Sequence, residues 1–459
     1  MSRKTTLSVF KISFILVLFL HTWQASAMTL MEAYEAALAN DSVYRSAQHE
    51  NEAGQQYKEI GRANLLPNIS ASYAYSRNNS EIEISGAGPT RSENRNYNSK
   101  NAIIQLRQPI INMEGWARFH QGNAQSNLSA MKFEGQRQEL ISRFFVLFSS
   151  ANYAKDVVAF SEVEKDSIKK QEEANKLMSQ RGEGTKTALI ESQAKLSLTE
   201  AQLIEAQQSL ADAQSALAVM IGKEVTILDR LVDTFEVLPI ESEDFSTWTN
   251  IALKNNPEIL TQQQGVEIAK QEVKRNRAGH MPRLDVLASV SKTESDTTST
   301  FNQDINTNSI GLQLNIPLYS GGSVNASTLQ AEANYKKAQD DLESKTNEVL
   351  LELRKQHTAL KTGLLKIEAL KQSVASSDLL VAATKKSLVG GVRTNLDVLD
   401  ARSQLYGAKR DLALAKYNYM VSYLNLKKSA GVLSVADLEK LSTYFVSEAG
   451  GTSSYQRSE

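Results

Sequence analysis

Few residues in this chain have the types and spacing that catalysis or metal binding requires. Cysteine is absent from the 459 residues, which excludes structural disulfides, thiolate metal sites and cysteine nucleophiles. The histidines are scattered and none forms a HExxH-type pair; they are His21, His49, His120, His280 and His357. No motif assembles a nucleophile, a base and an orienting group. We therefore expect no enzyme activity, no cofactor and no metal site.

Glycines interrupt the sequence at two places where a long helical pattern stops. The first place, Gly182 and Gly184, lies in the stretch Gly-Glu-Gly-Thr-Lys-Thr, which faintly resembles a phosphate-binding loop. The stretch lacks the Gly-Lys-Ser/Thr ending and a preceding strand, so nucleotide binding is not favoured. The second place is Gly390 and Gly391. We predict that a long helix reverses its direction at each of these places.

Two carboxylates follow the second reversal. Asp397 and Asp400 are three residues apart, so on a helix they project from roughly one face. Carboxylates gathered on one face attract cations. Alternatively, Asn395 is the N-cap of the helix, and Asp397 in its first turn complements the helix macrodipole. Both roles stay open, and one residue can fill both.

The elements on either side of these glycines are unusually long helices. No proline occurs from Glu114 to Met178, and apolar residues recur there at helical spacing. At 1.5 Å per residue this segment reaches roughly 100 Å. Residues 324–388 show the alternating three-and-four steps of coiled-coil packing. The returning helices are expected at 187–221 and 395–430.

The chain repeats one plan at an interval of about 210 residues, which indicates a duplicated half rather than a solenoid. Each half is predicted to contain a helix, two strands and a long helical hairpin. The first helix is expected at 29–65 and opens with Thr29 before Glu32, a capping box. We assign the first repeat to residues 28–222, a connecting region to 223–248, the second repeat to 249–431, and a partly disordered tail to 432–459.

Four strands are expected from alternating apolar and polar residues, at about 68–76, 101–108, 283–291 and 309–318. Polar segments at 77–100 and 292–308 are predicted to be solvated loops. Strands of this length can cross an outer membrane when tilted. Four strands cannot close a barrel, so subunits must share them. Three subunits give twelve strands and a passage. A soluble coiled-coil protein with a small water-exposed sheet is the alternative.

The first residues predict export from the cytoplasm. Arg3, Lys4 and Lys11 precede an apolar run that ends before Ala25-Ser26-Ala27. This order is typical of a cleaved signal peptide, which we place at residues 1–27. The chain has 51 Lys and Arg against 52 Asp and Glu, so nothing favours a nucleic-acid partner.

The stretch from Leu388 to Ala401, Leu-Val-Gly-Gly-Val-Arg-Thr-Asn-Leu-Asp-Val-Leu-Asp-Ala, resembles the TolC family of outer-membrane efflux and secretion proteins. Together with the duplicated plan, the resemblance covers essentially the whole mature chain. It implies an α+β membrane protein whose antiparallel coiled-coil helices form a periplasmic α-barrel. Each protomer would contribute four strands to a trimeric twelve-stranded β-barrel in the outer membrane. The implied partners are a periplasmic adaptor and an inner-membrane ABC transporter or other pump, with outer-membrane lipid around the barrel.

The resemblance also implies roles for residues near the reversals. Asp397 and Asp400 would line the pore constriction, and Arg393 would help to tie the closed end shut, with Glu191 as a further contact. The reversals would dock the adaptor; their residues are Gly182, Gly184, Thr187, Gly390, Gly391 and Thr394. Ile190, which the motif spacing aligns with Asp397, and Leu388, where the family often has tyrosine, depart from the family pattern. How the end stays closed is therefore left open.

Two transport functions and one structural function fit this resemblance. Many dedicated efflux channels carry a lipidated N-terminal cysteine, and this chain has none. The absence favours the exit duct of a type I protein secretion system. The outer-membrane component of a tripartite drug or metal efflux pump is the alternative, and a non-transporting periplasmic scaffold is the third.

Overall fold

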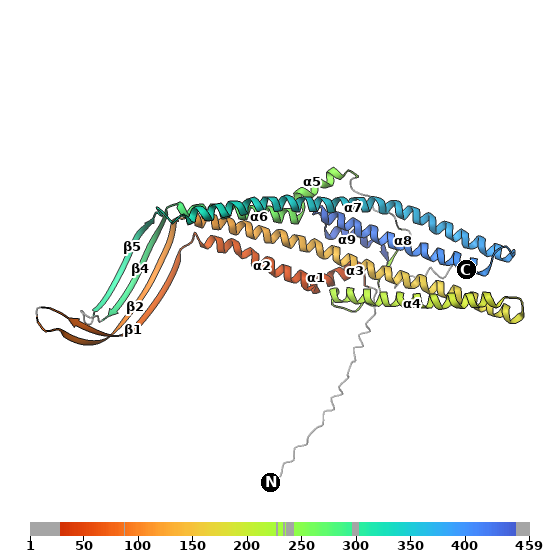
Figure 1. Cartoon of the computed structure of the whole chain (residues 1–459), viewed down its shortest axis with the longest axis horizontal. Helices are drawn as coiled ribbons and strands as arrows, with labels where there is room; N and C mark the ends of the chain where they lie inside the picture. The colour runs from red at the N-terminus through yellow and green to blue at the C-terminus, as the bar shows by residue number, and fades with distance from the viewer. Residues whose placement is uncertain are drawn as a thin grey trace, which may run out of the picture.

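The fold is elongated, with a sheet at one end and two helix reversals at the other (Figure 1). A computed structural model describes residues 28–86, 88–225, 228–232, 235, 243–295 and 303–446. The predicted signal peptide lies outside these residues. Among the helices of the described part, none combines the length and the apolar character needed to cross a membrane.

The two halves of the chain follow the same order of elements. The first half contains α1 (Leu30–Asn40), α2 (Ser42–Ala63), β1 (Asn68–Ile84), β2 (Arg91–Ile111), α3 (Met113–Arg181) and α4 (Lys186–Ile221). The second contains α5 (Phe245–Asn255), α6 (Pro257–Arg277), the 3-10 turn η1 (Ala278–His280), β4 (Arg283–Ser295), β5 (Gln303–Asn315), α7 (Ser323–Val389) and α8 (Asn395–Ser429). Helices α3 and α7 have 69 and 67 residues, so each is about 100 Å long.

The first helix of each half is broken by a capping residue. The predicted single helix over 29–65 is wrong in this respect: it opens with the expected Thr29–Glu32 capping box but stops at Asp41. The Asp41 side chain accepts from the Tyr44 N–H at 2.7 Å and so starts α2. Asn256 does the same for α6, accepting from the N–H groups of Glu258 and Ile259. A short polar side chain before a helix competes for the backbone and so ends the preceding helix.

The four long strands form one antiparallel sheet in the order β1-β2-β4-β5. One face is apolar and exposed in the single chain, with one row formed by Ile69, Leu106, Ala288 and Ile310 in register. Ile310 is 81% exposed. The next row lies on the opposite, polar face and contains Ser70, Gln105, Ser289 and Ser309. An apolar face of this kind requires lipid or protein to cover it.

The strands extend further than predicted at their outer ends. Most of 77–100 and the flanks of 292–308 are strand rather than loop, since β1 and β2 pair as far as Ile84 and Arg91. Apolar and polar residues alternate only in the part of each strand near the helices, whereas strand pairing satisfies backbone groups whatever the side chains are. β5 ends at Asn315 rather than 318, before Pro317, which has no N–H to donate. Residues 296–302 lie outside the described residues.

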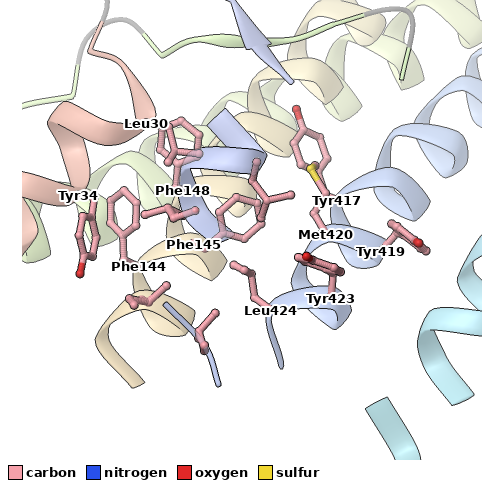
Figure 2. Close-up of a cluster of buried hydrophobic side chains, with 14 of the residues drawn as sticks. Leu30, Tyr34, Phe144, Phe145, Phe148, Tyr417, Tyr419, Met420, Tyr423 and Leu424 are labelled. Atoms are coloured by element: carbon pink, nitrogen blue, oxygen red, sulfur yellow. The ribbon is translucent and has the colours of Figure 1, made fainter. Parts of the chain in front are cut away.

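The main hydrophobic core lies midway along the helices, between α1, α3 and α8 (Figure 2). Phe144, Phe145 and Phe148 of α3 are fully buried and contact α1 and α8 residues of the same cluster. The Tyr34 ring of α1 packs edge-on against Phe144, with ring centroids 5.6 Å apart. Aromatic packing of this kind holds the two halves together midway between the sheet and the helix reversals.

Part of the predicted tail belongs to this core. α9 (Val435–Ser442) follows α8, and β6 (Phe445–Val446) pairs with β3 (Arg230–Leu231) from the connecting region. Phe445 packs on Phe148 with ring centroids 5.3 Å apart. Residues 447–459, and parts of the connecting region at 226–227, 233–234 and 236–242, lie outside the described residues.

Candidate constriction at the helix reversals

Both hairpins turn on a glycine in the left-handed conformation. Gly182 has φ +76° and Gly391 has φ +74°, values that only glycine adopts without strain. Three residues later a threonine caps the returning helix: Thr185 before α4 and Thr394 before α8. The two reversals are therefore the same turn, formed twice.

This equivalence corrects the alignment made from the sequence. Motif spacing paired Gly184 and Thr187 with Gly391 and Thr394, but the turn geometry pairs Gly182 and Thr185 with them. Thr187 lies in the exposed first turn of α4 and is not its N-cap. The spacing was misleading because glycine occurs at both 182 and 184, and only the first needs a positive φ.

The corrected alignment changes which residues of the first hairpin are equivalent to Asp397 and Asp400. Asp397 lies three residues after Thr394, and Ala188 lies three residues after Thr185, so Asp397 corresponds to Ala188 rather than to Ile190. By the same count Asp400 corresponds to Glu191, and both are exposed. The two halves thus carry one acidic residue in common, one turn into the returning helix.

Asp397 is a capping residue in this structure. Its Oδ2 accepts from the Thr394 backbone N–H and from the Thr394 hydroxyl, each at 2.8 Å, and its own N–H donates to Thr394 Oγ1. This is a complete capping box. The expectation that Asn395 is the N-cap is wrong, because Thr394 occupies that position. These hydrogen bonds from Thr394 hold the pKa of the Asp397 carboxyl below its ordinary value, with the nearby Arg393 as a smaller cause.

Asp400 is held much less firmly. Its carboxylate lies 3.9 Å from the ammonium of Lys195 on α4, and its side chain is 64% exposed. Arg393 reaches Asp397 at 3.4 Å and is 59% exposed. Asp397 therefore stabilises the start of α8, whereas the Asp400 side chain is largely exposed to solvent.

A polar cluster joins the two hairpins just above the reversals. Asn395 accepts from Gln171 at 2.9 Å and donates to Asn175 at 3.0 Å. Asn175 is buried and donates to the carbonyl of Ala188 at 3.2 Å, which adds α4 to the cluster. Helices α3, α4 and α8 are thus tied together by side-chain amides.

A second polar contact lies two turns further along α8. Arg402 donates to the carbonyl and hydroxyl oxygens of Ser167, and the Ser403 hydroxyl donates to Glu164 at 2.8 Å. Glu164 is buried, and burial lowers the pKa of the Arg402 guanidinium. Sequence reasoning missed these residues, although a signal was present. Glu164 and Asn175 lie four residues before and seven after the buried Ile168 on α3, so they are polar residues on its buried stripe.

Comparison with known proteins agrees with the duplicated plan. The family model described as Outer membrane efflux protein matches residues 33–223 and 248–432. The chain belongs to this family. The two matched segments of the outer membrane efflux protein family correspond to the two structural halves, on either side of the connecting region.

Two relatives are similar over nearly the whole chain. The alkaline protease secretion protein AprF of Pseudomonas aeruginosa is 38% identical over 92% of this chain and 88% of its own length. The proteases secretion protein PrtF of Dickeya chrysanthemi is 35% identical over 94% of each chain. Among solved structures, the CmeC outer membrane channel of Campylobacter jejuni has a TM-score of 0.77 at 18% identity, covering 97% of this chain and 98% of that one.

The separate roles of the two aspartates can be tested by amide hydrogen exchange in the first turn of α8. We expect Asp397→Ala to accelerate exchange there roughly fivefold at neutral pH, as for loss of a helix cap. The matched change Asp400→Ala should leave it unchanged. Because the pKa of Asp397 is lowered in the folded state, its contribution is present above the ordinary aspartate pKa of 3.8 and is lost as pH falls through the folded-state value. Equal protection in the two variants would contradict the capping role.

Proposed function

We propose that this protein is the outer-membrane exit duct of a type I protein secretion system. The observation that carries the proposal is the similarity to AprF and PrtF, two protease secretion proteins, over more than nine tenths of the chain. The structure supports a duct rather than an enzyme, because the candidate residues lie at the two helix reversals and on one face of the sheet. The duct would take an exported polypeptide from an inner-membrane ABC transporter and a periplasmic adaptor to the cell exterior.

The proposed assembly is a homotrimer in the outer membrane. β1 and β5 are the edges of the sheet, so their outer backbone groups need partners from other chains. If β5 of one protomer pairs with β1 of the next, three protomers close a twelve-stranded barrel with the apolar face towards lipid. Residues 1–27 would be the signal peptide that directs the chain out of the cytoplasm.

The reversals would form the constricted inner end and the adaptor-docking surface. Gly182, Gly391 and Thr394 shape this end through the turns and the cap of α8, and Gly184, Thr187 and Gly390 would add to the docking surface beside them. Exposed Asp400 and Glu191 occupy equivalent positions in the two hairpins. Three protomers would then present six carboxylates around the pore, with Arg393 and Asp397 holding the helix starts.

The polar cluster around Asn395 and Asn175 offers an answer to how the closed end is held when Leu388 stands where the family often has tyrosine and Ala188 stands where the second hairpin has Asp397. Amide hydrogen bonds between α3 and α8 would keep the second hairpin against the first. Such bonds exchange readily for water, so the hairpins can separate at modest cost when cargo passes.

The second candidate function is the outer-membrane component of a drug or metal efflux pump. The family model that matches this chain is described as an efflux protein, which is the observation that favours it. The same duct geometry would serve either cargo, and the inner-membrane partner would select it.

The secretion proposal can be tested by comparing secreted and surface proteins of a deletion strain and its parent by mass spectrometry. We expect one or a few exported proteins to disappear from the deletion strain and to return when the wild-type protein is supplied. If the two profiles match and drug or metal susceptibility rises instead, the efflux function replaces the secretion function.

The carboxylate ring can be tested by planar-bilayer recording under a salt gradient. Neutralising Asp400→Asn together with Glu191→Gln should reduce the cation-to-anion permeability ratio at least about twofold, because carboxylates at a constriction concentrate cations. Glu439→Gln, which removes an exposed carboxylate on α9, is the matched control and should have no effect. An unchanged ratio in the double variant would show that these residues do not line the pore.

A further inference from the structure

A buried carboxylate lies at the junction between the sheet and the helices. Asp285 of β4 is only 2% exposed. Arg107 of β2 donates to its Oδ2 from Nη2 at 2.6 Å and from Nε at 3.1 Å. Arg283 donates to both carboxylate oxygens from Nε, at 3.1 and 3.2 Å. One carboxylate therefore orients two guanidinium groups.

The two arginines remain accessible on their outer sides. Their side chains are 45% and 35% exposed, while that of Asp285 is 3% exposed. A guanidinium has five N–H donors in a planar fork, and the contacts to Asp285 use Nε and Nη2 of Arg107 and Nε of Arg283. The group of three carries one net positive charge, and the hydrogen bonds to Asp285 restrict the movement of both arginine side chains.

This group lies on the polar face of the sheet. Arg107 is in register with Asn68, two residues from the row that contains Ser70 and Ser289 and on the same side of the strands. The apolar row with Ile310 occupies the other side. In a closed barrel with lipid outside, the polar face is the lumen, so both guanidiniums would project into the passage.

A pocket of about 350 Å³ accompanies the group where β1 and β2 meet α2 and α3. Its wall includes Arg107, Arg283 and a third guanidinium, that of Arg118, which pairs with Glu114 at 2.7 Å. Asn64 and Asn112 also line the pocket and add polar side chains to its wall. Planar guanidinium groups in a solvent-accessible, partly enclosed pocket favour carboxylate ligands, which they bind through paired N–H donors.

We propose that Arg107 and Arg283, oriented by Asp285, form a carboxylate-binding collar that contacts acidic side chains of the exported polypeptide as it enters the barrel. The inference rests on the proposed secretion function and adds a site that binds acidic side chains of the exported polypeptide. Exposed ion pairs are weak, so each contact is brief and the chain moves on. The collar lies at the opposite end of the helices from the carboxylates Asp400 and Glu191, so the passage would carry charge of opposite sign at its two ends.

The collar can be tested with single channels of the purified protein in planar bilayers, using poly-L-glutamate as the probe. Arg283→Gln removes the net positive charge and leaves both hydrogen bonds from Arg107 to Asp285 Oδ2 in place, which protects the fold. We expect its poly-L-glutamate blockades to be on the order of fivefold shorter than those of the wild type, as for loss of one exposed charge-assisted contact per protomer. Arg283→Lys should retain most of the blockade duration, because it keeps the charge.

The control is Arg77→Gln, the same charge change on β1, on the side of the strands that carries the apolar row. Blockade durations that are equal in Arg283→Gln and wild type, or shortened equally by Arg77→Gln, would overturn the collar while leaving the duct intact. If the wild-type protein forms no conducting channel, the proposed function fails and the collar fails with it.

Discussion

A sheet of four strands cannot end within lipid, because the outer N–H and C=O groups of its edge strands would have no partner there. In this chain the edges are β1 and β5, and the sheet that they bound has one exposed apolar face. Exposing that apolar face to water is unfavourable, and exposing the unpaired backbone groups of the edge strands to lipid is unfavourable as well. Pairing between copies satisfies both requirements at once. The position of the helices depends on this constraint, since two helical hairpins continue from the inner end of the same sheet.

The helical part solves a different physical problem, which is to hold two hairpins of about 100 Å together along their length. An aromatic cluster at mid-length, with Phe144, Phe145 and Phe148 at its centre, joins the two halves. Near the reversals the contacts between hairpins include amides, a guanidinium and a buried Glu164. Apolar packing dominates the middle, and near the reversals these hydrogen bonds accompany a smaller apolar cluster of Val381, Ala401 and Leu405.

Much of the fold could be predicted from the sequence because its signals are long and periodic. Helices of more than 60 residues without proline, and the duplicated order of elements, are confirmed. The outer ends of the strands were missed, because backbone pairing there continues without an apolar pattern. The break at Asp41 was missed because the hydrophobic periodicity continues through it. The Asp41 side chain hydrogen-bonds to the backbone and ends the helix there, and periodicity does not reveal such a bond.

The site was predictable in part. The glycine reversals were located, but two glycines within three residues allowed the wrong one to be aligned, and φ decides between them. Asp397 and Asp400 look equivalent in sequence, yet one is engaged by Thr394 and the other is open to solvent. Asn175 and Asp285 were not found at all, since each depends on partners far away in the chain: Asn395 for the first and Arg107 for the second.

The central claim is that the sheet is complete only when several copies share it, and the mass of the assembly tests it most directly. We would extract the protein from outer membranes in a mild detergent and measure its mass by native mass spectrometry. The account predicts a stable species of three chains, which would supply the twelve strands of a closed barrel. A monomer with the sheet intact, or a dimer as the largest stable species, would contradict it.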